Sequence, residues 1–204
     1  LGAQFLLWEF ATAVAGRLLE VNPFDQPDVE SAKIAARGML EQRAAEHPAL
    51  FSDGAVEVRS QALELSSDLN LEQAIAALLA KLSQTTGYIS IHAYLDRHSA
   101  GSASELRDLL ARRTGRPVTF GWGPRFLHST GQYHKGGPKQ GVFLQLTAKA
   151  SRDFAVPGRD FSFGQLIASQ AAGDANVLAE LGLPVLRLNF TDVAAGLAQL
   201  KSAI

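Results

Sequence analysis

Short apolar runs recur along the second half of the chain, and this pattern constrains the fold more than any other feature. The runs have the length of buried strands and occur at residues 88–95, 117–122, 141–147 and 184–190. Two of the segments between them have the spacing of helices. Parallel strands need such crossovers, and the helices then cover both faces of the sheet. The sequence therefore predicts an α/β fold with a mostly parallel sheet of about four strands covered by helices.

Start and stop signals mark the two helices between these runs. Ser102-x-x-Glu105 and Ser162-x-x-Gln165 have the spacing of capping boxes, in which two side chains bond the first backbone N–H groups of a helix. Gly182 suits the end of the second helix, because glycine readily adopts the left-handed conformation found there. We therefore expect one helix to begin near residue 102 and another to run from about 162 to 181.

The N-terminal segment is predicted to be helical. Residues 1–19 are mostly apolar, and we expect a helix that is buried on most sides. Glu9 and Arg17 argue against a membrane span, and the segment lacks the basic leader of a signal peptide. A second helix should begin near residue 25, and a third should run from residue 71 to about 82.

These signals divide the chain into three expected regions. They are a helical tail over residues 1–45, a linker or small excursion with one weak strand over 46–70, and an α/β domain over 71–204. The 204 residues include 47% hydrophobic and 19% charged residues, as in ordinary globular proteins. The net charge of −1 gives no electrostatic reason to expect a nucleic-acid or membrane partner. The absence of Cys excludes disulfides and fits a reducing compartment such as the cytoplasm.

A glycine-rich stretch over residues 123–138 is a candidate substrate or anion loop. It follows a predicted strand, where parallel sheets place ligands, and its glycines would let backbone N–H groups approach an anion. Its polar side chains are Arg125, His128, Ser129, Thr130, His134 and Lys135. The spacing of its two histidines matches no usual metal motif, so no metal site is predicted. An ordinary flexible connection is an equally favoured interpretation.

Residues 22–33 read NPFDQPDVESAK and form a second motif. With the residues before them they fit the pattern Gly, any residue, two apolar residues, four other positions, then Phe-Asp-Gln-x-Gly-Val-Glu-x-x-Lys. The matching positions are Gly16, Leu18, Leu19, Phe24, Asp25, Gln26, Val29, Glu30 and Lys33. Asp28 is the one departure, since the pattern usually has glycine there. This motif resembles a C-terminal signature of phosphoglucose isomerases.

The resemblance implies a role for Lys33. In that family the matching lysine contacts the sugar near its ring oxygen and helps the ring to open. Asp25, Gln26 and Glu30 would then support the lysine or cap its helix. On its own, a lysine one helical turn after Glu30 is typical of a solvated surface pair.

Several longer strings are similar to the C-terminal part of bifunctional transaldolase/phosphoglucose isomerases: LHSTGQYHKGGP, FSFGQLIASQAAGD and VLRLNF. The resemblance implies a cytoplasmic enzyme of carbohydrate metabolism that interconverts glucose 6-phosphate and fructose 6-phosphate through ring opening and an enediolate. No cofactor is implied. The implied partners are a hexose phosphate, an upstream isomerase domain of the same parent chain and a possible second copy.

The phosphate-binding loops, the glutamate base and the histidine of that family precede the lysine motif and are not matched here. We therefore expect these residues alone to be inactive, and no transaldolase chemistry is assigned to them. A non-catalytic sugar-phosphate-binding or assembly module is the alternative, with residues 123–138 as its ligand loop. A small α/β ligand-binding protein unrelated to sugars would account for the strands but not for the lysine motif.

Overall fold

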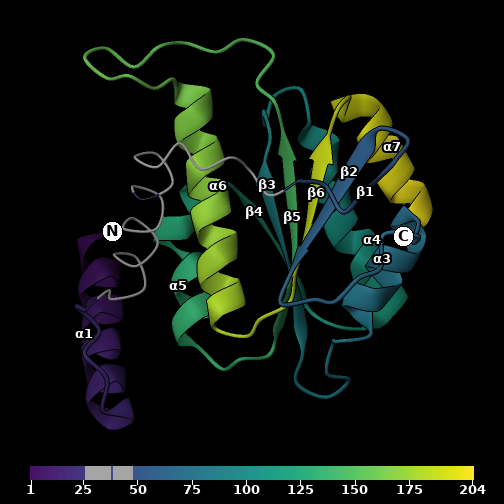
Figure 1. Ribbon diagram of the computed structural model, residues 1–204. Helices are drawn as coiled ribbons and strands as arrows, with labels where there is room; N and C mark the ends of the chain where they lie inside the picture. The colour runs from purple at the N-terminus through teal and green to yellow at the C-terminus, as the bar shows by residue number, and fades with distance from the viewer. Residues whose placement is uncertain (26–37, 39–47) are drawn as a thin grey trace.

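The protein folds around one six-stranded sheet with helices on both faces (Figure 1). The computed structural model describes residues 1–25, 38 and 48–204. The strands are β1 (Phe51–Asp53), β2 (Val56–Gln61), β3 (Tyr88–Tyr94), β4 (Val118–Trp122), β5 (Gly141–Ala148) and β6 (Val185–Phe190). Their order across the sheet is β1-β2-β6-β5-β3-β4. The predicted α/β fold is confirmed.

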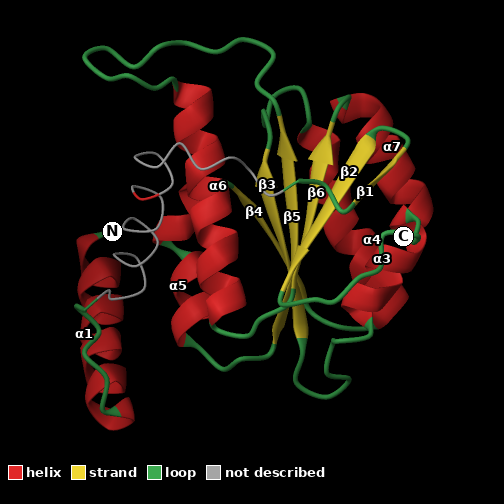
Figure 2. Ribbon diagram, in the orientation of Figure 1, coloured by secondary structure: helices red, strands yellow, loops and turns green. Residues whose placement is uncertain are grey.

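The four predicted apolar runs form the parallel part of the sheet. β3 pairs in parallel with β4 on one side and with β5 on the other, and β5 pairs in parallel with β6. Figure 2 shows these strands between two layers of helix. Each run is short and mostly apolar, so the local sequence was sufficient to find it.

A hairpin adds two antiparallel strands to the sheet, of which the sequence predicted only one. β2 pairs antiparallel with β6, and β1 pairs with β2 at the edge of the sheet. Residues 46–70, expected as a linker or small excursion with one weak strand, therefore hold two strands. Val56 and Val58 point into the core and are fully buried. β2 has only these two alternating apolar residues, and its partner strand β6 lies far along the chain. The local signal for β2 was therefore weak.

One face of the sheet carries the main apolar core. It is covered by α3 (Leu71–Leu79), α4 (Leu106–Thr114) and α7 (Val193–Ala203) (Figure 1). Ile75, Leu110 and Leu200 from these helices pack with Ile91 and Leu144 of the strands. Burying each such side chain contributes about 1.5–3 kcal/mol. This face therefore supplies most of the apolar stabilisation.

The other face of the sheet is covered by η2 (Arg125–His128), α5 (Thr130–Gly136) and α6 (Phe163–Glu180) (Figure 1). Residues 123–138, expected as a long loop, thus contain two short helices. Phe126 and Leu127 are buried in a cluster with Tyr94 and Ala171, and this packing holds the segment against the sheet. Tertiary packing, not local helix signal, orders these residues.

The two predicted capping boxes have different outcomes. Ser162 accepts a hydrogen bond from the Gln165 backbone, and the Gln165 side chain bonds the Ser162 N–H, as predicted for the start of α6. The prediction of a capping box at Ser102 is wrong. Residues 101–105 form a 3-10 helix, η1 (Gly101–Glu105), and neither it nor the following α4 has a side-chain cap. Ser102 lies within the 3-10 turn and so cannot cap α4.

The first helix, α1 (Gly2–Leu19), matches the predicted extent. The expectation that it is buried on most sides is wrong for the described residues, where Gly16 is its only buried residue, packed against Pro23. Large side chains such as Phe5, Trp8 and Leu18 are 61%, 70% and 78% exposed. Figure 1 shows α1 standing outside the helix layers of the sheet. Within the described residues no helix has both the length and the apolar character needed to cross a bilayer.

Candidate functional site

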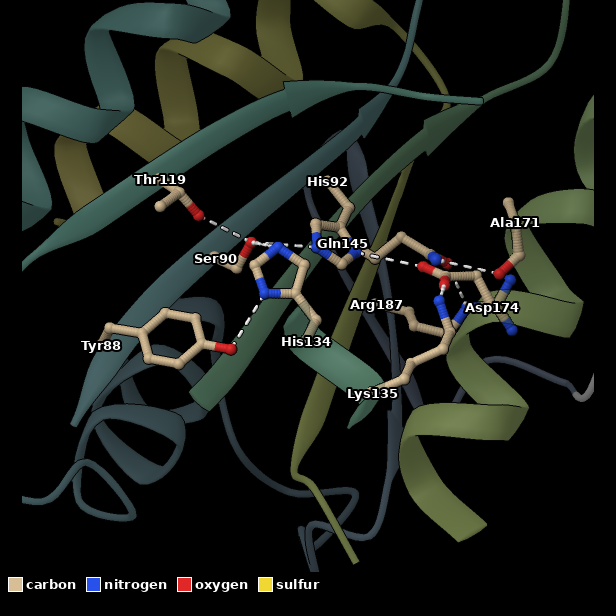
Figure 3. A network of polar contacts seen from close by, with 10 residues as sticks. All are labelled: Tyr88, Ser90, His92, Thr119, His134, Lys135, Gln145, Ala171, Asp174 and Arg187. Carbon is tan, nitrogen blue, oxygen red and sulfur yellow. Dashed lines mark hydrogen bonds and ion pairs between the residues drawn. The ribbon is translucent and has the colours of Figure 1, made fainter. Parts of the chain in front are cut away.

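A band of buried polar side chains crosses the sheet face beneath α5 and α6 (Figure 3). His92 of β3 lies in register with Gln145 of β5, which lies in register with Arg187 of β6. These three residues are 1%, 0% and 4% exposed. Parallel strands covered on both faces are usually apolar throughout, so this band is the most unusual feature of the core.

Helix α6 contributes the acidic member of the band. Asp174 is fully buried, and its Oδ2 lies 3.1 Å from Nδ1 of His92. The neighbouring residues Ala171, Gly173 and Ala175 are small and buried, which allows the helix backbone to come close to the strands. The Gln145 side chain accordingly donates to the Ala171 carbonyl at 2.9 Å.

A hydrogen-bonded series runs from Asp174 through His92 to Ser90. Nε2 of His92 lies 3.0 Å from Oγ of Ser90, and the Thr119 hydroxyl of β4 donates to the same oxygen at 2.9 Å. Arg187 Nε donates to Gln145 Oε1 at 2.8 Å and so extends the band toward β6. Both ring nitrogens of His92 are thus hydrogen-bonded inside the core.

Two adjacent residues of α5 complete the network from the opposite side. His134 Nδ1 lies 2.9 Å from the Tyr88 hydroxyl, and its Nε2 lies 3.1 Å from Ser90 Oγ. Lys135 Nζ donates to Asp174 Oδ1 at 2.5 Å. His134 and Lys135 are 3% and 5% exposed, so both point into the core (Figure 3).

One arrangement of hydrogens satisfies this network when both histidines are neutral. The Asp174 carboxylate only accepts, so His92 Nδ1 donates to it and His92 Nε2 accepts. Ser90 then donates to His92 and accepts from its two other partners. His134 Nδ1 remains as the acceptor for the Tyr88 hydroxyl. A further proton on this network would turn at least one hydrogen away from its partner.

The pKa shifts agree with this arrangement. Burial, together with the neighbouring His92, lowers the pKa of His134 from 6.5 to about 3, so this imidazole is neutral. Burial alone would raise the pKa of Asp174, but the hydrogen bond from His92 and the charge of Lys135 hold it below 3.8. Burial, with a smaller effect of Tyr133, raises the pKa of Tyr88 to about 12. At neutral pH the network therefore contains the Asp174 carboxylate, a neutral His134 imidazole and the neutral Tyr88 phenol.

The order Asp174, His92, Ser90 is the order found where a histidine activates a serine nucleophile. Ser90 is only 1% exposed, however, and its oxygen already accepts two hydrogen bonds. A pocket of about 370 Å³ lies elsewhere, between residues 153–162 and the start of α6. In the described structure the network therefore holds elements together and offers no access to a substrate. Among the described residues, no group of three or more His, Asp or Glu is placed to hold a metal ion.

The predicted anion-loop residues separate into two groups. Arg125, His128, Ser129 and Thr130 are exposed, whereas His134 and Lys135 are buried. Because Lys135 is already paired with Asp174, its charge is compensated inside the core. The first four residues alone could meet a ligand from solvent.

The predicted lysine site lies mostly outside the described residues. Lys33, Gln26 and Glu30 all belong to the part of the chain for which no structure is described. Asp25 is described and exposed, and its backbone N–H donates to the Asn22 carbonyl at 3.3 Å. The proposed roles of these residues therefore stay predictions.

Sequence reasoning did not identify several members of the buried network, namely Tyr88, Ser90, Thr119, Gln145, Asp174 and Arg187. A signal was present in the apolar runs that contain them. Gln145 interrupts GVFLQLTA, Arg187 interrupts VLRLNF, and Asp174 follows the small residues AAG. Buried polar groups need partners, so isolated polar residues in three buried segments predict that they meet.

The fold and this network define the chain as an α/β protein with a buried hydrogen-bonded polar band under one helical layer. No protein-family model and no curated protein matches the sequence. The structure is similar to that of the hypothetical protein TT0462 from Thermus thermophilus, with a TM-score of 0.52 and 19% identity. The similarity covers 85% of this chain and 42% of that protein, so this chain spans less than half the length of its structural relative. At this identity the similarity shows the fold alone.

Proposed function

We propose that the chain is the C-terminal part of a glucose-6-phosphate isomerase, of the type whose parent also carries a transaldolase domain. The observation that carries this proposal is the lysine motif ending at Lys33, in which nine typed positions match at fixed spacing. Lys33 would assist opening of the sugar ring in the cytoplasm, and no cofactor is required.

The chemistry explains why a lysine suits this position. Ring opening needs a proton transferred to the ring oxygen, and the enediolate that follows needs a cation or hydrogen-bond donor beside it. An ammonium group can serve either purpose. A base must also move a proton between C1 and C2, and no residue of this chain is matched to that base. The upstream isomerase domain would supply it, so the active site is composite.

The exposed helix α1 supports a composite arrangement. It directly precedes the motif and presents Phe5, Trp8, Phe10 and Leu18 to solvent, each more than 60% exposed. Exposed apolar surface of this extent is typical of a surface that another domain covers. An apolar groove of the upstream isomerase domain is the partner that this proposal expects, with a second copy as the other possibility.

A coupled assay of fructose 6-phosphate conversion to glucose 6-phosphate tests the proposal. The parent protein should turn over the sugar, while the isolated chain should show no turnover above background. Near-full turnover by the isolated chain would contradict a composite site. A parent without any isomerase activity would overturn the proposed function itself.

A second candidate function is a non-catalytic sugar-phosphate-binding or assembly module. The specific observation in its favour is the exposed group Arg125, His128, Ser129 and Thr130. Titration of the isolated chain with fructose 6-phosphate, followed by calorimetry, distinguishes the two. Under this alternative Arg125→Ala would weaken binding and Lys33→Ala would leave it unchanged. Absence of any binding by the isolated chain would remove this candidate.

A further inference from the structure

Helix α5 is attached to the sheet through two neighbouring side chains. It has seven residues, contains Gly131 and Gly136, and is followed by Gly137. His134 joins it to β3 through Tyr88 and Ser90, and Lys135 joins it to α6 through Asp174. We propose that these two contacts form a pH-sensitive latch, in which protonation of His134 releases α5 from the sheet. This inference is independent of the proposed isomerase function.

The network is built so that α5 can leave without breaking the rest of it. Ser90, His92 and Asp174 bond one another, and Thr119 bonds Ser90, without any atom of α5. Release of α5 would therefore leave the sheet and α6 with most of their hydrogen bonds. The groups that lose a partner are the Tyr88 hydroxyl, which can turn to water, one oxygen of Asp174, and Ser90 Oγ, which keeps its bonds to His92 and Thr119.

A proton added at His134 conflicts with the groups around it. Both ring nitrogens would then donate, so the hydrogen of Tyr88 would have to turn away from the ring. The titratable and charged groups facing the ring are Tyr88 and His92 from β3, Asp174 from α6, and Tyr133 and Lys135 from α5 itself. Phe143 of β5 closes the remaining side and carries no charge.

The charges around His134 disfavour a protonated ring while α5 lies against the sheet, which we call the closed position; in the open position α5 is released. Asp174 is the negative group among them, and it already bonds both Lys135 and His92. A buried cation without its own counter-ion is strongly disfavoured. Once α5 is released, His134 meets water and can be charged without this cost. Acid therefore favours the open position.

The size of the effect follows from the two pKa values. In the closed position His134 has a pKa of about 3, against 6.5 for the solvated group. Because the open position binds the proton more tightly, the ratio of open to closed rises as pH falls below 6.5. Linkage gives an increase of roughly 25-fold between pH 7 and pH 5.

Amide hydrogen exchange tests the latch directly. Protection factors of the amides of residues 134–137 should fall by roughly 25-fold from pH 7 to pH 5, after correction for the intrinsic exchange rate. The amides of β3 and β5 should keep their protection. His134→Gln retains an N–H for Ser90 but does not titrate, so its α5 protection should not depend on pH. His98→Gln, at an exposed histidine, is the matched control and should behave like the wild type.

Two results would overturn the proposal. One is an equal loss of α5 protection in wild type and His134→Gln, or no loss in either. The other is parallel loss in β3 and β5, which indicates unfolding of the whole domain. Should His134→Gln fail to fold, the wild-type imidazole can be titrated by NMR. It should be the Nε2–H tautomer at pH 7, and an apparent pKa near 6.5 with α5 still protected would contradict the latch.

Discussion

Lys135 and Asp174 form an ion pair of 2.5 Å between Nζ and Oδ1, with side chains 2% and 0% exposed. The pair joins α5 to α6 beside His92 and His134, the two histidines that are buried among the described residues. Removing one partner leaves the other charge buried, which costs about 3–5 kcal/mol. We therefore expect Asp174→Asn to lower the free energy of unfolding by about 3–5 kcal/mol in urea denaturation.

The exposed pair of Lys201 and Glu105 is the matched control. Its atoms are 2.8 Å apart, but Glu105 is 65% exposed, so water screens the interaction. Glu105→Gln should change the free energy of unfolding by less than about 1 kcal/mol. Equal effects of the two substitutions would contradict the importance given to the buried pair.

Stability should fall with acid because of His134. The pKa of this residue is about 3 in the folded protein and 6.5 when solvated, so the unfolded state binds more protons between these values. Folding stability contributed by the neutral ring is present above pH 6.5 and is lost as pH falls below it, by about 3 kcal/mol at pH 4. Asp174 adds a further loss only below 3.8, since its folded pKa is lowered.

This pH dependence is measured by urea denaturation between pH 7 and pH 4. His134→Gln should be less stable at pH 7 but should lose most of the slope between pH 6.5 and 4. If the slope is the same in wild type and variant, another group is responsible for the acid sensitivity.

The hairpin should be part of the folding core and not a dispensable excursion. Val58 is fully buried and pairs in register with Leu188 of β6. Val58→Ala should destabilise the protein by roughly 1–3 kcal/mol, through lost burial and the cavity that remains. Leu18→Ala, at a position 78% exposed, should change stability by less than about 0.5 kcal/mol. A Val58 variant as stable as the Leu18 variant would show that the hairpin is peripheral.

The apolar surface of α1 should make the isolated chain associate. Sedimentation velocity should show an average mass that rises with concentration for the wild type. Replacing Trp8 and Leu18 together by Ser should reduce this rise, since both side chains are mostly exposed. Gln4→Ser on the same helix should not. A wild-type chain that stays monomeric at all concentrations would mean that α1 is not a contact surface in the isolated chain.

The sequence predicted the features whose signals are local. The four parallel strands are mostly apolar runs, and the capping box at Ser162 needs only residues three apart. One weak strand was expected over residues 46–70, but the full hairpin was not, because β2 depends on pairing with β6, which follows more than a hundred residues later. The short helices over residues 125–136 were missed because buried Phe126 and Leu127 order them through contacts with Tyr94 and Ala171.

The members of the buried network could not be grouped from the sequence for the same reason, because their contacts depend on long-range packing. His134 and Lys135 were selected for their chemistry in a glycine-rich stretch, but their burial depends on how α5 meets the sheet. Their partners Ser90 and Asp174 come from other elements, and no short motif links them. Each is an isolated polar residue in a segment that must be buried, and this pattern is the signal that could have joined them.

The proposed isomerase function depends most on Lys33. The direct measurement is the rate of conversion of fructose 6-phosphate to glucose 6-phosphate by the full-length parent carrying Lys33→Ala, with Lys81→Ala at an exposed lysine as control. We expect Lys33→Ala to lower kcat by about 100-fold or more, as for a group that assists proton transfer, and Lys81→Ala to have no effect. A Lys33→Ala parent with the kcat of the wild type would contradict the proposed function.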